Sequence, residues 1–222
     1  DMFTSAVAIF SGGTSFRWVR DYLCKQLTAE AQAAGEDPYE AMTRLAEQSP
    51  PGARKLLFNP SLAGGSSLDA SPNIRGAVLG LDLGHTQADL LRAAMEGIAL
   101  NLRLVLDELR RLGSVGNEMV VVGGASRSAL WRQILADALE VDIVKTNVGQ
   151  EAGSLGAAAV AAVACGLWAD FDPIIQVHQI EAVARPITDN IAVYRQILPV
   201  FRQAAKDQAA LGDLLAGLSI PG

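Results

Sequence analysis

The chain contains 222 residues, of which 50% are apolar, 19% charged and 5% aromatic. This apolar share excludes a disordered segment, and the length suffices for one domain with a large core, expected over residues 1–222. Lys and Arg number 18 against 24 Asp and Glu, so the formal net charge is −6, and the basic residues are scattered. Nucleic acid and anionic membranes are therefore not expected partners, because both bind concentrated Lys and Arg.

The first half of the chain combines short strand patterns with polar helical segments. The expected elements are, in chain order, a strand at 6–10, a helix at 16–23, a polar Ala-rich helical region to Gln48, a strand at 56–58 and a loop at 60–72. A Ser-Pro-Pro-Gly sequence ends the helical region at 49–52. The loop is rich in Gly, Ser and Pro, and loops of this length are usually functional edges or lids.

The clearest element is a long helix at 86–112. Its apolar residues repeat at helical spacing, Thr86 and Asp89 resemble a capping box, and Gly113 ends it. The elements expected after it are a buried strand at 119–122, a helix at 128–139, a strand at 141–145, an Ala-rich helix at 152–169 and an amphipathic helix at 188–215. This alternation predicts an α/β fold with a partly parallel sheet.

The Ala-rich segment 152–169 carries no charge but has few of the Leu, Ile and Phe residues that drive membrane insertion. We therefore expect a tightly packed internal helix. Cys24 and Cys165 lie in apolar helical segments and are expected to be buried thiols of a cytoplasmic protein. No signal peptide is expected at the start, and His85 and His178 stand alone, so no metal site is expected.

A glycine turn follows the strand at 119–122. Gly123 and Gly124 allow a ligand to approach bare backbone in front of a helix N-terminus, although glycine pairs also make ordinary turns. The dinucleotide pattern GxGxxG is broken at Ala125 and Ser128, and Ser128 also replaces the last glycine of a nucleophile elbow. A Walker A loop is excluded because no Gly-Lys-Ser/Thr sequence occurs.

A second glycine turn, Gly12-Gly13, precedes Arg17. Its Thr and Ser residues are typical of an ordinary N-cap, and the alternative is a phosphate contact with Arg17 one turn into the helix. A third segment at 151–158 contains Gly and Ala spaced for close packing of another element. Asp82 and His85 are expected to form a solvated turn rather than an acid–base pair. The acidic and basic residues of 107–111 are expected to lie on an exposed helix face.

Three blocks in this order resemble the C-terminal half of the FGGY carbohydrate kinase family. They are RGAVLGL at 75–81, GGASRSALWRQILAD at 123–137 and EAGSLGAA at 151–158. Residues 88–107 are similar to the long helix of the family, and WVRD at 18–21 also fits. The resemblance covers roughly residues 5–205. Its motifs are specific to the family when they occur together, and the sequence as a whole is most similar to the xylulokinase branch.

The resemblance implies an α/β fold of the actin-like ATPase (ribonuclease H-like) type, with a mixed sheet flanked by helices. This chain would be the C-terminal half of a two-domain kinase that binds ATP between its halves. The residues that match nucleotide-binding positions of the family are Gly123, Gly124 and Ala125 against the adenosine, Ser128 beside the adenine, and Gly13 and Arg17 near the phosphates. The family often has Gln where Arg17 stands.

The implied reaction is transfer of the γ-phosphoryl group of Mg-ATP to a hydroxyl of a pentulose or polyol. The catalytic aspartate of the family matches no residue here, so this chain alone is not expected to catalyse, and the Mg²⁺ ligands are expected in the other half. Residues 62–72 lack the Gly-Glu-Arg-Thr-Pro run of typical xylulokinases. The implied partners are the sugar or polyol and the kinase's own N-terminal domain. Whether the kinase forms a homodimer is left undecided by the sequence.

Two alternatives come from other classes of protein. The first is a non-catalytic module that keeps this fold for partner binding or oligomerisation. The second is the dinucleotide-binding domain of an oxidoreductase, which the broken glycine pattern disfavours.

Overall fold

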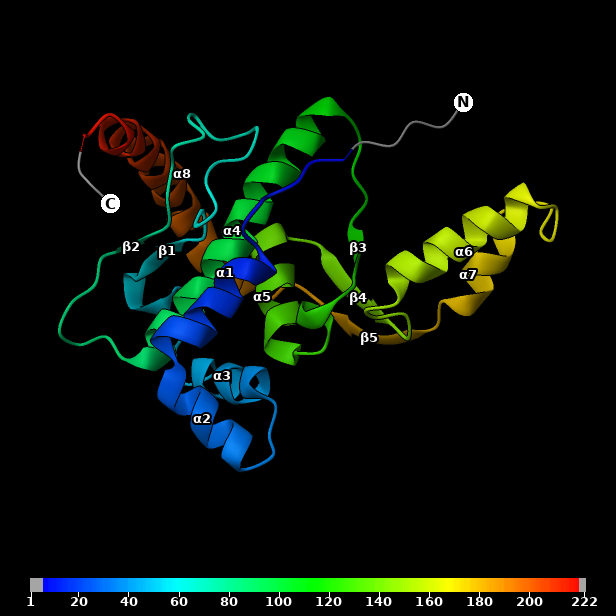
Figure 1. Cartoon of the computed structure of the whole chain (residues 1–222), viewed down its shortest axis with the longest axis horizontal. Coiled ribbons are helices and arrows are strands. Elements are labelled where there is room, and N and C mark those ends of the chain that lie inside the picture. The colour runs from blue at the N-terminus through cyan, green and yellow to red at the C-terminus, as the bar shows by residue number, and fades with distance from the viewer. Residues whose placement is uncertain (1–5, 220–222) are drawn as a thin grey trace.

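The computed structural model describes residues 6–219 as helices packed around a small mixed sheet and a two-stranded ribbon (Figure 1). The helices are α1 (Gly13–Trp18), a π-helical turn (Val19–Leu23), α2 (Lys25–Ala33), α3 (Pro38–Ala46), α4 (Gln87–Leu112), α5 (Ala129–Leu139), α6 (Ala152–Ala164), α7 (Asp172–Val177) and α8 (Thr188–Ala216). The strands are β1 (Leu57–Asn59), β2 (Ala77–Leu79), β3 (Glu118–Val121), β4 (Asp142–Thr146) and β5 (Ile180–Ala184).

The larger sheet has the strand order β3-β4-β5, in which β3 and β4 are parallel and β4 and β5 antiparallel. The expected α/β architecture with a partly parallel sheet is therefore confirmed. Strands β1 and β2 form a separate antiparallel pair. Sequence patterns did not predict β2, β5 or α7, because each is short and lacks a clear period.

Helix α4 forms the centre of the core, where it packs against α3, α5, α8 and β1. It begins with the predicted capping box, in which the Thr86 N–H donates to Asp89 Oδ2 at 2.8 Å. Leu91 and Met95 are fully buried. A Cβ atom at Gly97 would lie 1.9 Å from the carbonyl oxygen of Phe58, so the helix backbone rests directly on β1. This crossing fixes α4 against the N-terminal half of the chain.

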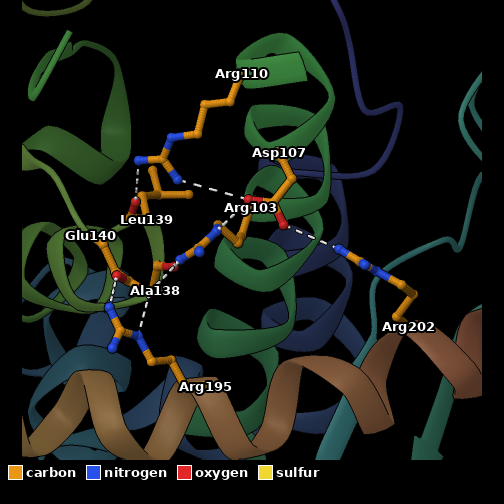
Figure 2. Close-up of polar contacts among 8 residues, drawn as sticks. All are labelled: Arg103, Asp107, Arg110, Ala138, Leu139, Glu140, Arg195 and Arg202. Atoms are coloured by element: carbon orange, nitrogen blue, oxygen red, sulfur yellow. Dashed lines mark hydrogen bonds and ion pairs between the residues drawn. The ribbon is translucent and has the colours of Figure 1, made fainter. Parts of the chain in front are cut away.

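The prediction that 107–111 is a simple exposed helix face is wrong for part of it. Asp107 accepts from Arg103 Nε at 2.7 Å and from Arg202 Nη2 of α8 at 3.1 Å (Figure 2). Glu108 and Arg111 do pair on the exposed surface. The helix face is partly covered because α8 crosses it, which charge pattern alone does not reveal.

The same cluster caps the C-terminus of α5 (Figure 2). Arg103 Nη1 donates to the carbonyl of Ala138 at 2.8 Å and to Glu140 Oε1 at 2.9 Å. Glu140 also accepts from Arg195 Nε of α8 at 3.0 Å. Arg110 Nη2 donates to the Leu139 carbonyl at 3.1 Å, so Arg103 and Arg110 satisfy carbonyl groups that the helix end leaves free, and their charge opposes the negative end of the helix dipole. The arrangement joins α4, α5 and α8.

One prediction for the N-terminal region is wrong, and the boundaries of two predicted helical segments differ. Residues 6–10 form no strand, since no strand of the described residues pairs with them. The first helix begins at Gly13 and continues as the π-helical turn, and the helical region to Gln48 is divided between α2 and α3. The division falls at Gly35, which has a φ of +72°, and at Asp37, whose side chain caps α3 by accepting from the Tyr39 N–H at 2.9 Å.

The Ala-rich segment was expected to be an internal helix, and this is also wrong. Helix α6 ends at Ala164, only Ala159 and Ala162 are buried within it, and Val160 is 59% exposed. Cys165 is exposed as well, whereas Cys24 is buried as predicted. Figure 1 shows α6 and α7 projecting from the end of the sheet, away from the core. No helix within residues 6–219 is long and apolar enough to cross a membrane.

Candidate functional site

Three aromatic side chains join segments that are far apart in the sequence. Phe16 of α1 stacks on Tyr39 of α3 with ring centroids 6.0 Å apart. The same ring meets Trp131 of α5 edge to face at 5.3 Å. Phe16 and Trp131 are both buried. This cluster brings the two glycine turns and α3 around one space.

That space is a cavity of about 1000 Å³ between α1, α3, α5 and the end of β3, at the upper end of the range for small-molecule sites. Five of the six predicted nucleotide-binding residues line it, namely Gly13, Arg17, Gly124, Ala125 and Ser128. The sixth, Gly123, is not part of the lining. Tertiary packing therefore unites glycine turns that lie more than 100 residues apart in the sequence.

Gly123 and Gly124 have different physical roles. Gly123 adopts a φ of +80°, which favours glycine, and its carbonyl accepts from Ser126 Oγ at 2.7 Å. It therefore shapes the turn. A Cβ atom at Gly124 would meet no atom within 4 Å, so the backbone at this position faces open space in the cavity wall.

Ser128 begins α5 as its N-cap. Its hydroxyl oxygen accepts from the Trp131 N–H at 3.1 Å, which leaves the hydroxyl hydrogen available to a ligand in the cavity. Arg127, the preceding residue, also lines the cavity, is exposed, and forms no ion pair within residues 6–219. The sequence analysis did not select Arg127, because it belongs to no motif by itself.

The first glycine turn supplies the N-cap of α1, as the N-cap interpretation expects, but no side chain caps the helix. The N-cap residue is Gly12, without a side-chain hydrogen bond, and Ser15 Oγ donates instead to the carbonyl of Pro60 at 2.6 Å. A Cβ atom at Gly13 would meet nothing within 4 Å. Arg17 in the last turn of α1 is exposed and has no acidic partner among the described residues.

Helix α3 forms the opposite wall, which the sequence did not predict. Its contribution is mostly polar and acidic, comprising Asp37, Tyr39, Glu40, Thr43, Arg44 and Glu47. Arg44 pairs in a two-pronged contact with Glu36, and this contact lowers the pKa of the Glu36 carboxyl. On the sequence alone these charges look like an ordinary solvated helix face.

The charges in the cavity are therefore segregated. Arg17 and Arg127 lie with the glycine turns, whereas Glu40 and the C-cap residue Glu47 lie on the α3 wall, whose one cation, Arg44, is paired with Glu36. An anionic group in the cavity is attracted to the first end and repelled from the second. Within residues 6–219, no group of three His, Cys, Asp or Glu side chains could hold a metal ion.

Asp82 and His85 lie outside the cavity lining. The Asp82 N–H donates to His85 Nδ1 at 3.0 Å, and the Gly84 N–H donates to Asp82 Oδ1 at 2.7 Å. These residues form a hydrogen-bonded turn in front of α4, as the sequence predicts.

Comparison with known proteins identifies the class to which this fold and cavity belong. A family model described as the C-terminal domain of the FGGY family of carbohydrate kinases matches residues 2–165. Gluconokinase of Bacillus subtilis is 32% identical over 192 residues, which are 86% of this chain and 37% of that protein. The structure of ligand-bound xylulose kinase from Lactobacillus acidophilus matches with a TM-score of 0.76 at 30% identity, over 90% of this chain and 39% of that one.

The chain belongs to the FGGY family of carbohydrate kinases and matches its C-terminal domain. It shares the α/β fold of those kinases, as the resemblance implied. Xylulose kinase of Staphylococcus epidermidis is 30% identical over 217 residues, which are 97% of this chain and 42% of that protein. The chain thus spans about two fifths of the length of the relatives it matches.

Proposed function

We propose that this chain is the ATP-binding half of an ATP-dependent carbohydrate kinase, which transfers the γ-phosphoryl group to a hydroxyl of a pentulose or polyol. The observation that carries this proposal is the cavity in which Gly13, Arg17, Gly124 and Ser128 meet. Membership of the FGGY family supports the class of reaction. Residues 1–222 would form one domain of this kinase, and its free cysteines favour a cytoplasmic location.

The cavity fits a nucleoside di- or triphosphate. Its volume is about 1000 Å³, and the backbone at Gly13 and Gly124 faces open space that a side chain would otherwise fill. The phosphates would lie toward Gly13 and Arg17 and away from the carboxylates of α3, which repel them. Adenosine would then lie against Gly124 and Ala125, with the Ser128 hydroxyl donating to the base.

Bound Mg-ATP supplies the phosphoryl group, and this chain's own residues would bind and orient it. Positioning and electrostatics account for most of the catalysis in phosphoryl transfer. We propose that the catalytic base, the sugar contacts and the Mg²⁺ ligands belong to the N-terminal domain of the longer kinase. Closure of the two domains would exclude water from the transferred group.

Calorimetric titration of the chain with Mg-ADP and, separately, with NAD tests the proposal. We expect saturable binding of Mg-ADP and none of NAD. Gly124→Val should weaken Mg-ADP binding about tenfold or more, equivalent to about 1.4 kcal/mol, because the new side chain enters the cavity without straining the fold. Gly113→Val is the matched control, since a Cβ atom there also meets nothing within 4 Å and Gly113 lies outside the cavity.

NAD binding without Mg-ADP binding would favour the oxidoreductase alternative. Binding of neither nucleotide, by this chain or by the product of its complete reading frame, would favour the non-catalytic module. With the complete product, phosphorylation assays on gluconate, xylulose and glycerol would identify the acceptor.

A further inference from the structure

The first glycine turn is held in place by contacts outside the cavity. Gly12 and Gly13 both line the cavity, and no side chain caps α1 behind them. Glycine has more backbone freedom than other residues, so neighbouring contacts must set the position of this turn. Ser11 and Ser15, which lie on either side of it in the sequence, are 2% and 1% exposed, and neither lines the cavity.

Both serines bond to the segment that follows β1. Ser15 Oγ donates to the Pro60 carbonyl at 2.6 Å, and the Ala63 N–H donates to Ser11 Oγ at 3.1 Å. These partners are 45 and 52 residues away in the sequence. Pro60 and Ala63 do not line the cavity either. The two serines therefore fix the turn to residues 60–63 through groups that are not part of the cavity wall.

Residues 60–63 are themselves tied to the core of the protein. The Leu62 N–H donates to the same Pro60 carbonyl at 2.6 Å. The side chain of Asn59, the last residue of β1, accepts from the Ser61 N–H at 3.0 Å. Strand β1 in turn lies directly against the backbone of α4 at Gly97. The position of the glycine turn is thus set relative to the central helix.

We propose that Ser11 and Ser15 are positioning residues that hold the Gly12-Gly13 turn where the terminal phosphates of the nucleotide bind. They act through Pro60 and Ala63 and do not touch the nucleotide. Small displacements of a group that orients a reacting phosphate are costly, so loss of either anchor weakens the phosphate contacts selectively. This inference rests on the proposed nucleotide site and assigns two residues that no motif singles out.

Nucleotide titration of Ser15→Ala in the product of the complete reading frame gives the first test. We expect the affinity for Mg-ADP to fall about tenfold, because the turn is no longer fixed opposite the β-phosphate. The affinity for AMP, which lacks that phosphate and keeps its adenosine contacts at Gly124, should change by less than about twofold. Ser11→Ala should act in the same direction.

Ser71→Ala is the matched control. Ser71 is 5% exposed, and its hydroxyl donates to Asp213 Oδ1 at 2.5 Å, so this variant also loses a buried serine hydrogen bond. Ser71 lies in the same loop as Ala63 but makes no contact with the glycine turn through that bond. We expect its ratio of ADP to AMP affinity to equal that of wild type. Urea unfolding shows that each variant is folded at the temperature of the titration.

Hydrogen exchange of the wild-type kinase tests the same link without a substitution. Binding of Mg-ADP should slow exchange of the Ala63 amide, which donates to Ser11 Oγ, although Ala63 lies outside the cavity. AMP should leave this rate unchanged. The matched comparison is the Asn73 amide, which donates to Ser71 Oγ at 3.0 Å and should not respond to either nucleotide.

Three results would count against the proposal. Equal losses of ADP and AMP affinity in Ser15→Ala would assign this serine a purely structural role and overturn it. An exchange rate at Ala63 that Mg-ADP does not alter would overturn it as well. A wild-type kinase that binds neither ADP nor AMP would refute the proposed nucleotide site, and this inference with it.

Discussion

Gly97 offers a direct test of how α4 is seated on β1. Its Cα lies so close to the strand that a Cβ atom would be 1.9 Å from the carbonyl oxygen of Phe58 and 3.0 Å from the carbonyl carbon. Ordinary contacts of a Cβ atom begin at 3.4 Å. Gly97→Ala therefore requires α4 and β1 to separate by about 1.5 Å, and the atom in the way is backbone rather than a flexible side chain.

Two opposing effects set the magnitude for Gly97→Ala. Alanine favours a helix over glycine by about 1 kcal/mol. Overpacking a core costs about 1–3 kcal/mol and sometimes more, and here α4 also carries the contacts to α3, α5 and α8. The obstructing atom is backbone, so the overpacking cost lies in the upper part of its range, and after subtraction of the helix-propensity gain we expect the free energy of unfolding to fall by about 1–2 kcal/mol.

Urea unfolding followed by circular dichroism measures this change. Gly156→Ala is the matched control, because Gly156 is also helical and a Cβ atom there meets nothing within 4 Å. That variant should be more stable than wild type by about 0.5–1 kcal/mol. A Gly97→Ala protein as stable as wild type would refute the close approach of α4 to β1.

The remaining predictions concern pH and thiol reactivity. Hydrogen bonding to Arg195 lowers the pKa of Glu140 from 4.5 to about 2, so its stabilisation is complete above about pH 5 and is lost as the pH falls toward 2. Arg195 is 66% exposed, so solvent screens this ion pair and its contribution to stability is small. Urea unfolding should show Glu140→Gln less stable than wild type at pH 7, with a smaller difference at pH 3; a constant difference would contradict this. A colorimetric thiol reagent should label exposed Cys165 rapidly and Cys24 only after unfolding, because Cys24 is buried and its pKa is raised; two fast thiols would contradict it.

The sequence by itself determined the elements whose patterns are local. Helix α4 and its capping box, strands β3 and β4, and the glycine turn before α5 were all predicted close to their observed positions. The prediction that the strand at 119–122 is buried is wrong, because Val120 is 53% and Val122 45% exposed in the described residues. Apolar spacing and turn residues act over a few neighbouring positions, so they are visible without a partner. The resemblance to the kinase family added the nucleotide-binding positions, five of which line the same cavity.

Tertiary structure alone decided which of these elements meet and which faces are covered. The acidic α3 wall of the cavity has no motif, and it becomes part of the site only because Phe16, Tyr39 and Trp131 pack together. The coverage of Asp107 and the exposure of α6 were predicted wrongly for the same reason. Local patterns state which side of an element is apolar, but burial depends on whether another part of the protein lies against that side.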